Sequence, residues 1–389
     1  MRHIDRSLQE PLRSALRSFA AVVVTGPRRS GKTTLLRRAV PEAQYCLLED
    51  LDLLQRFRAD PRGFVASLTP PVILDEIQNA PELFAYVRTR IDAKPRRTGQ
   101  WLLTGSQEAP LMQRVTESLA GRAAVLQLPP LSVLETSKVT PLRGGFPEVL
   151  ARPRAADLWF RSYVQTYLER DVRAVTEIRD LATFRRFVAL VASRCGQMLN
   201  KADLAAPLGV SVPTIGQWLS ILEVTGQLLL VPPYFENFGK RLVRSPKLYF
   251  ADTGLLCHLL GLETTALLAK SPFSGAVFEN FVASEIVKAQ VGAGRRREIY
   301  WFRDQQGLEV DFVVPVPGGQ VLLAEAKAAV SAVPRDARGL LRLREAMGAR
   351  VRECILVHRP GLDASTEVLV PGVAAVDVLG LLARVVSGR

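Results

Sequence analysis

The sequence is poor in the residues that build metal sites and covalent cross-links. Its 389 residues include four cysteines, which lie far apart with no CxxC pair, and three scattered histidines. A zinc site and a disulfide framework are therefore not expected. Apolar runs long enough for a membrane helix are missing, and the charged start MRHIDRSLQEPLRS lacks the apolar core of a signal peptide. We expect a cytoplasmic protein that has no membrane segment.

Acidic residues are outnumbered by basic ones. The chain has 51 Lys and Arg against 38 Asp and Glu, a formal net charge of +13. A positive balance favours polyanions such as DNA as partners, because counterions are released on association. An Arg-rich composition gives the same charge to proteins that never bind nucleic acid, so composition leaves the partner open. At 389 residues the chain is too long for one hydrophobic core, and two or three domains are expected.

Hydrophobic patterning divides the chain into three predicted domains, 1–140, 141–270 and 271–389. In the first, the apolar strands AVVVTG, PVILDE and QWLLTGS alternate with helical segments, which indicates a parallel sheet with helices on both faces. The second contains amphipathic helices, a helix–turn–helix over NKADLAAPLGVSVPTIGQWLSILEVTG and two strands typical of a β wing. The third returns to an α/β pattern with the strands EIYWFR, LEVDFVV, VLLAEAK and ECILVH. The predicted fold class is α/β.

A phosphate-binding loop follows the first strand. Residues 26–33 fit GxxxxGK[ST] in full, between a strand and a helix, which is the context that the motif requires. Glycines let the backbone N–H groups face phosphate oxygens, and the start of the helix adds positive potential. Lys32 would contact the β- and γ-phosphates, and Thr33 would ligate Mg²⁺. The predicted ATP site comprises Gly26, Pro27, Arg28, Arg29, Ser30, Gly31, Lys32, Thr33 and Thr34.

Acidic residues end the second apolar strand. Asp75 and Glu76 follow the run VIL at the carboxyl end of a predicted central strand, where ligands of such sheets bind. We expect Asp75 to hold Mg²⁺ and Glu76 to polarise the attacking water. The third strand ends with Thr104 and Ser106, and either hydroxyl could sense the γ-phosphate. Capping of the next helix is the alternative role for both side chains.

The motifs GPRRSGKTTLL, VILDEIQNAPELF, WLLTGSQ, SLAGR, PLSVLE and GGFPEVL, in that order, resemble a prokaryotic family of AAA-type ATPases. The resemblance continues through YLERDV, KLYFADTGLL, FENFVASEI, EVDFVV and EAK, and so covers nearly the whole chain. It implies ATP binding and a C-terminal domain similar to restriction-endonuclease folds. It also places Arg122, in SLAGR, where AAA-type ATPases carry an arginine that faces the neighbouring subunit's γ-phosphate, which implies a homo-oligomer. A structural arginine that caps a helix or pairs with a carboxylate is the alternative.

Residues 184–250 resemble a winged helix, a fold that binds DNA. The segment 211–222 has no Lys or Arg, and the side chains that could reach base edges are Ser211, Thr214 and Gln217. Positive charge lies instead in the predicted wing, at Lys240, Arg241, Arg244 and Lys247. Backbone contact with DNA through the wing is one interpretation. A packing or protein-contact module is the other.

A second group of charged residues lies in the third domain. Glu279 is on a predicted helix, Asp311 is in strand LEVDFVV, and Glu325 and Lys327 share one face of the next strand. Two acids and a lysine on adjacent strands can bind a divalent ion and activate water for phosphodiester hydrolysis. In this hypothesis Asp311 and Glu325 ligate the metal, Lys327 stabilises charge and Glu279 assists. The group is similar to the PD-(D/E)XK nuclease signature, with Val310 in place of the leading proline. A solvated sheet edge and an inherited fold without activity are the alternatives.

Three functions follow from these patterns. The leading hypothesis is Mg²⁺-dependent binding and hydrolysis of ATP by an AAA-type ATPase that acts on or assembles with DNA. The second is an ATP-dependent nuclease that uses the C-terminal group of Glu279, Asp311, Glu325 and Lys327. The third is a module whose nucleotide state controls protein contacts.

Overall fold

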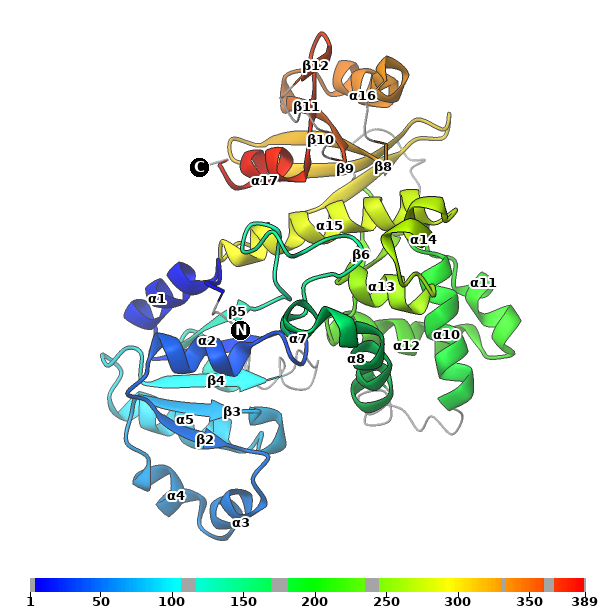
Figure 1. Cartoon of the computed structure of the whole chain (residues 1–389). Coiled ribbons are helices and arrows are strands. Elements are labelled where there is room, and N and C mark those ends of the chain that lie inside the picture. Colours follow the sequence, from blue (N-terminus) through cyan, green and yellow to red (C-terminus); the bar gives the residue numbers. More distant parts are fainter. Residues whose placement is uncertain are drawn as a thin grey trace. The chain divides into compact units, whose positions relative to one another are not determined.

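The computed structural model of the chain, drawn in Figure 1, describes residues 4–105, 117–168, 181–234, 245–329, 333–359 and 367–387. The chain forms two compact units. Unit 1 comprises residues 1–130 with 224–226 and 291–295, and unit 2 comprises 131–223, 227–290 and 296–389. Within the described residues no single helix is both long and apolar enough to cross a bilayer, and one bent pair, 201–208 with 212–224, meets that test only when taken together.

Unit 1 is built on a five-stranded sheet with the order β2-β3-β4-β1-β5, in which every neighbouring pair is parallel. Its strands are β1 Ala21–Thr25, β2 Gln44–Leu47, β3 Val72–Asp75, β4 Trp101–Gly105 and β5 Ala123–Gln127. β1, β3 and β4 are buried along their whole length, as expected for apolar runs that are covered on both faces. The predicted parallel sheet is confirmed, and its three predicted strands lie between the two edge strands β2 and β5.

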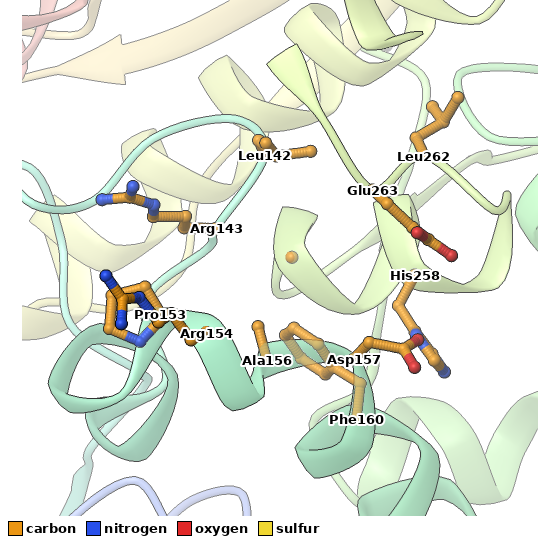
Figure 2. Close-up of a pocket in the computed structure, with 11 residues that line it drawn as sticks. Leu142, Arg143, Pro153, Arg154, Ala156, Asp157, Phe160, His258, Leu262 and Glu263 are labelled. Atoms are coloured by element: carbon orange, nitrogen blue, oxygen red, sulfur yellow. The ribbon is translucent and has the colours of Figure 1, made fainter.

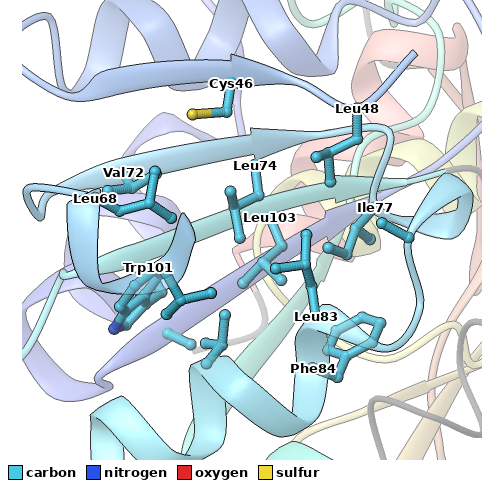
Figure 3. Close-up of a cluster of buried hydrophobic side chains, with 14 of the residues drawn as sticks. Cys46, Leu48, Leu68, Val72, Leu74, Ile77, Leu83, Phe84, Trp101 and Leu103 are labelled. Atoms are coloured by element: carbon cyan, nitrogen blue, oxygen red, sulfur yellow. The ribbon is translucent and has the colours of Figure 1, made fainter. Parts of the chain in front are cut away.

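Helices cover both faces of this sheet, as predicted. They are α1 Gln9–Ser18, α2 Lys32–Ala39, α3 Leu51–Ala59, α4 Pro61–Ser67 and α5 Leu83–Ala93. Alternate residues of β1 enter two different hydrophobic clusters: Val23 packs in the cluster that contains α5, and Val22 and Val24 pack in the cluster that contains α1 and α2. Figure 3 shows the first cluster, with Leu103 of β4 and Leu83 of α5 among its members.

The first part of unit 2 is mainly helical. Its helices are α7 Pro147–Ala151, α8 Ala156–Tyr163, α10 Leu181–Ser193, α11 Lys201–Ala205, α12 Val212–Val224, α13 Thr253–Leu259 and α14 Thr265–Lys270. The segment 201–208 meets 212–224 at 110°, so the predicted helix–turn–helix is present. Two strands follow the helix–turn–helix, as predicted. They are β6 Leu228–Val231 and β7 Lys247–Phe250, and they pair antiparallel. Most of the predicted wing, including Lys240, Arg241 and Arg244, lies outside the described residues.

The second part of unit 2 contains a mixed sheet with the order β12-β13-β11-β10-β9-β8. Its strands are β8 Tyr300–Arg303, β9 Glu309–Val316, β10 Gln320–Lys327, β11 Val351–His358, β12 Glu367–Val370 and β13 Val373–Val376. β8, β9 and β10 run antiparallel, whereas β10, β11 and β13 run parallel. The accompanying helices are α15 Ser274–Gly292, α16 Arg338–Met347 and α17 Val378–Val386. The predicted α/β pattern is confirmed, and the likeness to restriction endonucleases stays a prediction.

Candidate nucleotide-binding site

The predicted phosphate-binding loop joins β1 to α2. Gly26 has a φ of 143° and Gly31 a φ of 97°, both in the region that favours glycine. Space also excludes a side chain at Gly26, because its Cβ would lie 2.2 Å from the carbonyl oxygen of Leu128. Arg29 adopts a positive φ of 64° although it is not glycine. The two glycines of the motif are thus required by the backbone path that leads to Lys32, where α2 begins.

Two basic side chains hold this loop in shape. Arg6, which is buried, donates from Nη1 to the carbonyl of Ser30 at 2.8 Å. Lys32 is 5% exposed and donates from Nζ to the carbonyls of Gly26 and Pro27, at 3.1 Å each. Sequence reasoning identified Lys32 from the motif and missed Arg6, because Arg6 lies outside the motif and nothing in the sequence pairs it with the loop.

Asp75 is the last residue of β3 and is 3% exposed. Three hydroxyl groups donate to it, from Thr33 at 2.9 Å, from Tyr45 at 2.6 Å and from Thr104. The predicted Mg²⁺ ligands Thr33 and Asp75 are therefore in contact. Of the two hydroxyls considered at the end of the third strand, Thr104 contacts Asp75, and Ser106 lies outside the described residues.

Tyr45 is a site residue that sequence reasoning missed. It lies on the edge strand β2, whose register pairs Leu47 with Asp75. Burial and the hydrogen bond to Asp75 raise the pKa of the phenol, so Tyr45 stays protonated and remains a donor. The guanidinium of Arg37 covers its ring at 4.9 Å from the centroid. Tyr45 lies on a short, partly exposed strand and belongs to no sequence motif. Its role becomes visible only when the pairing of β2 with β3 is known.

Glu76 has a left-handed backbone, with φ 58° and ψ 50°. For a residue other than glycine this conformation costs about 1–3 kcal/mol, and such strain concentrates at functional sites. Its N–H donates to Thr104 Oγ1 at 3.1 Å. Its Oε2 accepts from Gln78 and lies 4.0 Å from Arg28 Nη1. The second acid of the predicted pair is thus held at the end of β3, next to Asp75.

The residues of this site fit a nucleotide with Mg²⁺. The Lys32 ammonium and the backbone at the start of α2 supply the donors and positive charge that phosphate oxygens need. Ser30 Oγ is buried and has no hydrogen-bond partner among the described residues, and a phosphate oxygen would satisfy it. Thr33 and Asp75 offer oxygen ligands of the kind that Mg²⁺ prefers. Thr34 is exposed in the first turn of α2.

Arg122 lies at the opposite end of the sheet. It directly precedes β5, and because β5 runs parallel to β1, its position is at the amino ends of the strands, away from the phosphate-binding loop. Its Nε and Nη2 donate to the two carboxylate oxygens of Asp92, at 2.6 and 3.2 Å. This hydrogen bonding lowers the pKa of Asp92. Within one copy, Arg122 therefore pairs with a carboxylate, and its action on a second copy stays a prediction.

Unit 2 brings the four residues of the predicted C-terminal site together. Lys327 Nζ lies 2.8 Å from Glu325 Oε1, on the shared face that alternation predicted. Asp311 Oδ2 accepts from the N–H of Ala326 at 3.0 Å, and Glu325 Oε2 accepts from the N–H of Asp311 at 3.4 Å. Burial, followed by the charge of Asp311, raises the pKa of Glu279 and of Glu325 to about 7.

Lys247 is not in an exposed basic wing, and this corrects the sequence prediction. Its side chain is 4% exposed, and its Nζ lies 2.7 Å from Glu309, 3.1 Å from Glu279 and 3.4 Å from Asp311. Burial opposes the charge, but the carboxylates of Glu279, Asp311 and Glu309 outweigh it and raise the pKa of the ammonium. The prediction failed because Lys247 is the first residue of β7, a strand whose four residues are all buried, and the start of that strand is not visible in a short basic segment.

The predicted DNA-reading helix offers few free polar groups. The hydroxyls of Ser211 and Thr214 bond to each other at 2.8 Å, whereas Gln217 is exposed. With Lys247 buried, the basic residues that remain in the predicted wing lie outside the described residues. DNA contact through this segment stays a prediction.

Unit 2 also contains an open pocket of about 320 Å³, shown in Figure 2. His258 Nδ1 lies 3.0 Å from Asp157 Oδ1 in its wall, and Phe160 stacks on the His258 ring. Burial lowers the pKa of His258, so its ring is neutral at neutral pH. Arg143 and Arg154 line the opposite side of the pocket in this view. None of the residues predicted to be functional lines this pocket.

Three family models match parts of the chain. A model described as an AAA domain matches residues 18–137. Two models described as domains of unknown function, DUF8612 and DUF4143, match residues 135–266 and 274–370. Two uncharacterized proteins, Rv2008c of Mycobacterium tuberculosis and Mb2031c of Mycobacterium bovis, are each 34% identical over 314 residues, which are 79% of this chain and 70% of each relative.

Several solved structures are similar in part. The Walker-type ATPase PABY2304 of Pyrococcus abyssi is 16% identical, with a TM-score of 0.46 over 66% of this chain and 96% of that one. The RuvB Holliday junction branch migration motor of Thermotoga maritima is 17% identical, with a TM-score of 0.30 over 59% and 90% of the two chains. AMPPCP-bound DnaA from Aquifex aeolicus is 12% identical, with a TM-score of 0.28 over 56% and 85%. With scores this low, the assignment depends on the family model and the sequence relatives.

Proposed function

The chain belongs to the family of the two mycobacterial relatives and carries an AAA domain, and from this premise we propose that it binds ATP with Mg²⁺ at residues 26–33 and hydrolyses it. The observation that carries the proposal is the contact of Thr33 Oγ1 with the Asp75 carboxylate at 2.9 Å. This contact joins the end of the phosphate-binding loop to the end of β3. It is the arrangement in which a hydroxyl and a carboxylate hold the Mg²⁺ of a bound nucleotide.

Each residue of the site has a separate task in this proposal. Lys32 would exchange its bonds to the Gly26 and Pro27 carbonyls for bonds to phosphate oxygens. Thr33 and Asp75 would hold Mg²⁺, which when bound neutralises charge on the phosphates. Glu76 would accept a proton from, or orient, the attacking water. The left-handed backbone at Glu76 supports this role, because strained residues are retained where geometry is functional.

We propose that the protein acts on DNA while it hydrolyses ATP. We also propose that it works as a homo-oligomer. The net charge of +13 supports a polyanion partner through counterion release. The helix–turn–helix and the strand pair β6–β7 supply a second reason, since this combination can dock on a duplex. Double-stranded DNA is expected to raise ATP turnover in low salt, and the effect is expected to fade as salt is added. If ATP turnover is the same with and without DNA, a nucleotide-switched module for protein contacts becomes the better description.

Two substitutions test the ATP site. Lys32→Ala is expected to weaken ATP binding and abolish turnover, because it removes the phosphate-facing ammonium of the loop. Glu76→Gln is expected to retain binding and to lower turnover by roughly 10²–10⁴-fold, since an amide is a poor base. Binding is measured with a fluorescent ATP analogue, and turnover by phosphate release. Wild-type turnover in Glu76→Gln would remove Glu76 from its assigned role.

Gln78→Ala is the matched control for this test. It removes the side chain that donates to Glu76 Oε2 but leaves the carboxylate in place. We expect a smaller loss of turnover than in Glu76→Gln. Equal losses in the two variants would mean that the local structure, rather than the carboxylate, limits the reaction.

A further inference from the structure

Three carboxylates from two elements converge on one lysine in unit 2. Lys247 on β7 meets Glu279 of α15 and both Glu309 and Asp311 of β9, at nitrogen–oxygen distances of 3.1, 2.7 and 3.4 Å. Trp301 adds its ring, with the centroid 5.4 Å from Nζ. The ammonium is therefore surrounded by negative charge and aromatic surface, and its side chain is 4% exposed. This is the environment of a bound cation.

Several other contacts hold the oxygen atoms of the cluster. Asp311 Oδ2 accepts from the N–H of Ala326, and Glu325 accepts from Lys327 Nζ and from the N–H of Asp311. Glu279 Oε1, which contacts Lys247, also accepts from the Tyr249 hydroxyl at 2.6 Å. Across the described part of the chain, no group of three or more His, Cys, Asp or Glu side chains is arranged to hold a metal ion.

A divalent ion held by Asp311 and Glu325 would share the Asp311 carboxylate with the Lys247 ammonium. Mg²⁺ and Ca²⁺ need carboxylate oxygens at about 2.0–2.6 Å, and here the inner oxygens of Glu279, Glu309 and Asp311 are directed at Nζ. Two cations that share one carboxylate lie close enough to repel each other, and the double charge of the metal ion increases that repulsion. A metal could therefore enter only if Lys247 left, and moving the ammonium away would break its contacts with Glu279, Glu309 and Asp311.

We propose that Lys247 is the resident cation of this cluster, and that it takes the Asp311 oxygen that metal-dependent phosphodiester hydrolysis would give to a divalent ion. The residues of the PD-(D/E)XK-like group then form a structural ion cluster that ties β7 to α15 and β9. The metal and the residues do not fit each other while Lys247 is in place. The inference is independent of the ATP site, which lies in unit 1.

Mn²⁺ binding to the full, nucleotide-free chain tests this proposal. The wild type and Asp311→Asn are expected to bind the same amount of Mn²⁺, measured from the electron paramagnetic resonance signal of the free ion. Lys247→Met, which keeps an unbranched side chain one atom shorter and without the charge, is expected to bind one further Mn²⁺ at least about tenfold more tightly than the wild type. Adding Asp311→Asn to Lys247→Met is expected to remove that binding.

Two results would overturn the proposal. One is a wild-type chain that loses a bound Mn²⁺ on Asp311→Asn, and the other is Mn²⁺-dependent DNA cleavage by the wild type that Asp311→Asn removes. Lys327→Met is the matched control, because Lys327 pairs with Glu325 but is 36% exposed. A new Mn²⁺ site in Lys327→Met would also contradict a special role for Lys247. If Lys247→Met does not fold, the comparison of the wild type with Asp311→Asn still decides, and Glu279→Gln repeats it.

Discussion

Asp75 is held by hydroxyl groups from separate segments of unit 1. Thr33 lies in the first turn of α2, Tyr45 lies on the edge strand β2, and Thr104 lies on the neighbouring strand β4. Each hydrogen bond limits the rotation of the carboxylate, so the orientation of Asp75 is fixed before a ligand arrives. A carboxylate that is oriented in advance loses less entropy when it binds a cation.

Tyr45→Phe removes one of these hydrogen bonds and keeps the ring. A single hydrogen bond is worth about 0.5–1.5 kcal/mol, so we expect turnover at limiting Mg²⁺ to fall by about 2–12-fold. The Mg²⁺ concentration that gives half-maximal turnover is expected to rise, because the freed Asp75 carboxylate is less well oriented. A purely structural role would lower stability without changing the Mg²⁺ dependence.

Tyr86→Phe is the control for Tyr45→Phe, since it makes the same chemical change on α5, where the ring packs against Phe57. Both variants are compared in phosphate-release assays over a series of Mg²⁺ concentrations. An unchanged Mg²⁺ midpoint in Tyr45→Phe would show that the Thr33 and Thr104 contacts are sufficient to orient Asp75.

The site residues that belong to a sequence motif could be predicted. Those that reach the site through the pairing of strands or the path of the chain could not. Lys32, Thr33 and Asp75 follow from spacing, because the chemistry of a phosphate loop demands those residue types in that order. Tyr45 and Arg6 reach the same site from outside any motif. Finding them requires knowledge of which strand lies beside β3 and where the segment before β1 runs.

At the scale of elements, a buried aspartate joins two segments of unit 2. Asp252 caps α13 by accepting from the N–H groups of Gly254 and Leu255 at 2.9 and 3.2 Å, and its second oxygen accepts from the N–H of Gly145 at 2.6 Å. Gly144 has a φ of 64°, and a Cβ there would lie 2.0 Å from Asp252 Oδ1. The sequence motifs GGFPEVL and KLYFADTGLL therefore meet in space. Both carry much of the family resemblance, and their glycines have a structural reason.

Asp252→Ala is expected to destabilise unit 2 by about 2–4 kcal/mol, because it removes a helix cap and leaves the buried Gly145 N–H without its acceptor. The free energy of unfolding is measured by urea titration. Asp377→Ala removes a cap that makes one hydrogen bond to Gly380 on α17, and should cost about 1 kcal/mol. Equal losses in the two variants would show that the Gly145 contact adds nothing.

The fully buried strands of unit 1 were predictable and its edge strands were not. β1, β3 and β4 are buried throughout, so their composition alone separates them from helices and loops. β2 has two exposed residues out of four, and its sequence QYCL carries no alternation strong enough to identify it. The position of Lys247 in unit 2 was also not predictable from composition, since the direction of its side chain depends on how β7 pairs with β6.

At the scale of the whole molecule, Arg122 decides between a shared and a self-contained ATP site. Its pairing with Asp92 is on the surface, with side chains 37% and 47% exposed, so a second copy could compete for the guanidinium. If Arg122 acts on a neighbouring copy, specific activity should rise with protein concentration. A mixture of Arg122→Ala and Lys32→Ala should recover activity, because one interface then combines an intact loop with an intact arginine. Loss of such an arginine is expected to lower turnover by roughly 10³–10⁵-fold.

Asp92→Ala separates the two roles of Arg122. It breaks the ion pair and leaves the guanidinium free, so a shared site predicts turnover at or above the wild-type level. A structural role predicts that Asp92→Ala and Arg122→Ala lower the unfolding temperature alike and show no recovery on mixing. Turnover that is independent of concentration, together with no recovery, would leave Arg122 as a surface ion pair.

One side of the phosphate-binding loop packs directly against the backbone of Leu128. Gly26 lies so close to the Leu128 carbonyl that no side chain separates the two backbones, and Leu128 is itself bonded through its N–H to Thr25. Arg6 adds a second link, because it bridges the carbonyls of Ser30 and Pro129. Residues 128 and 129 immediately precede the point where the chain passes into unit 2. A shift of the loop on nucleotide exchange would therefore also displace residues 128 and 129, because Gly26 and Arg6 hold the two segments together.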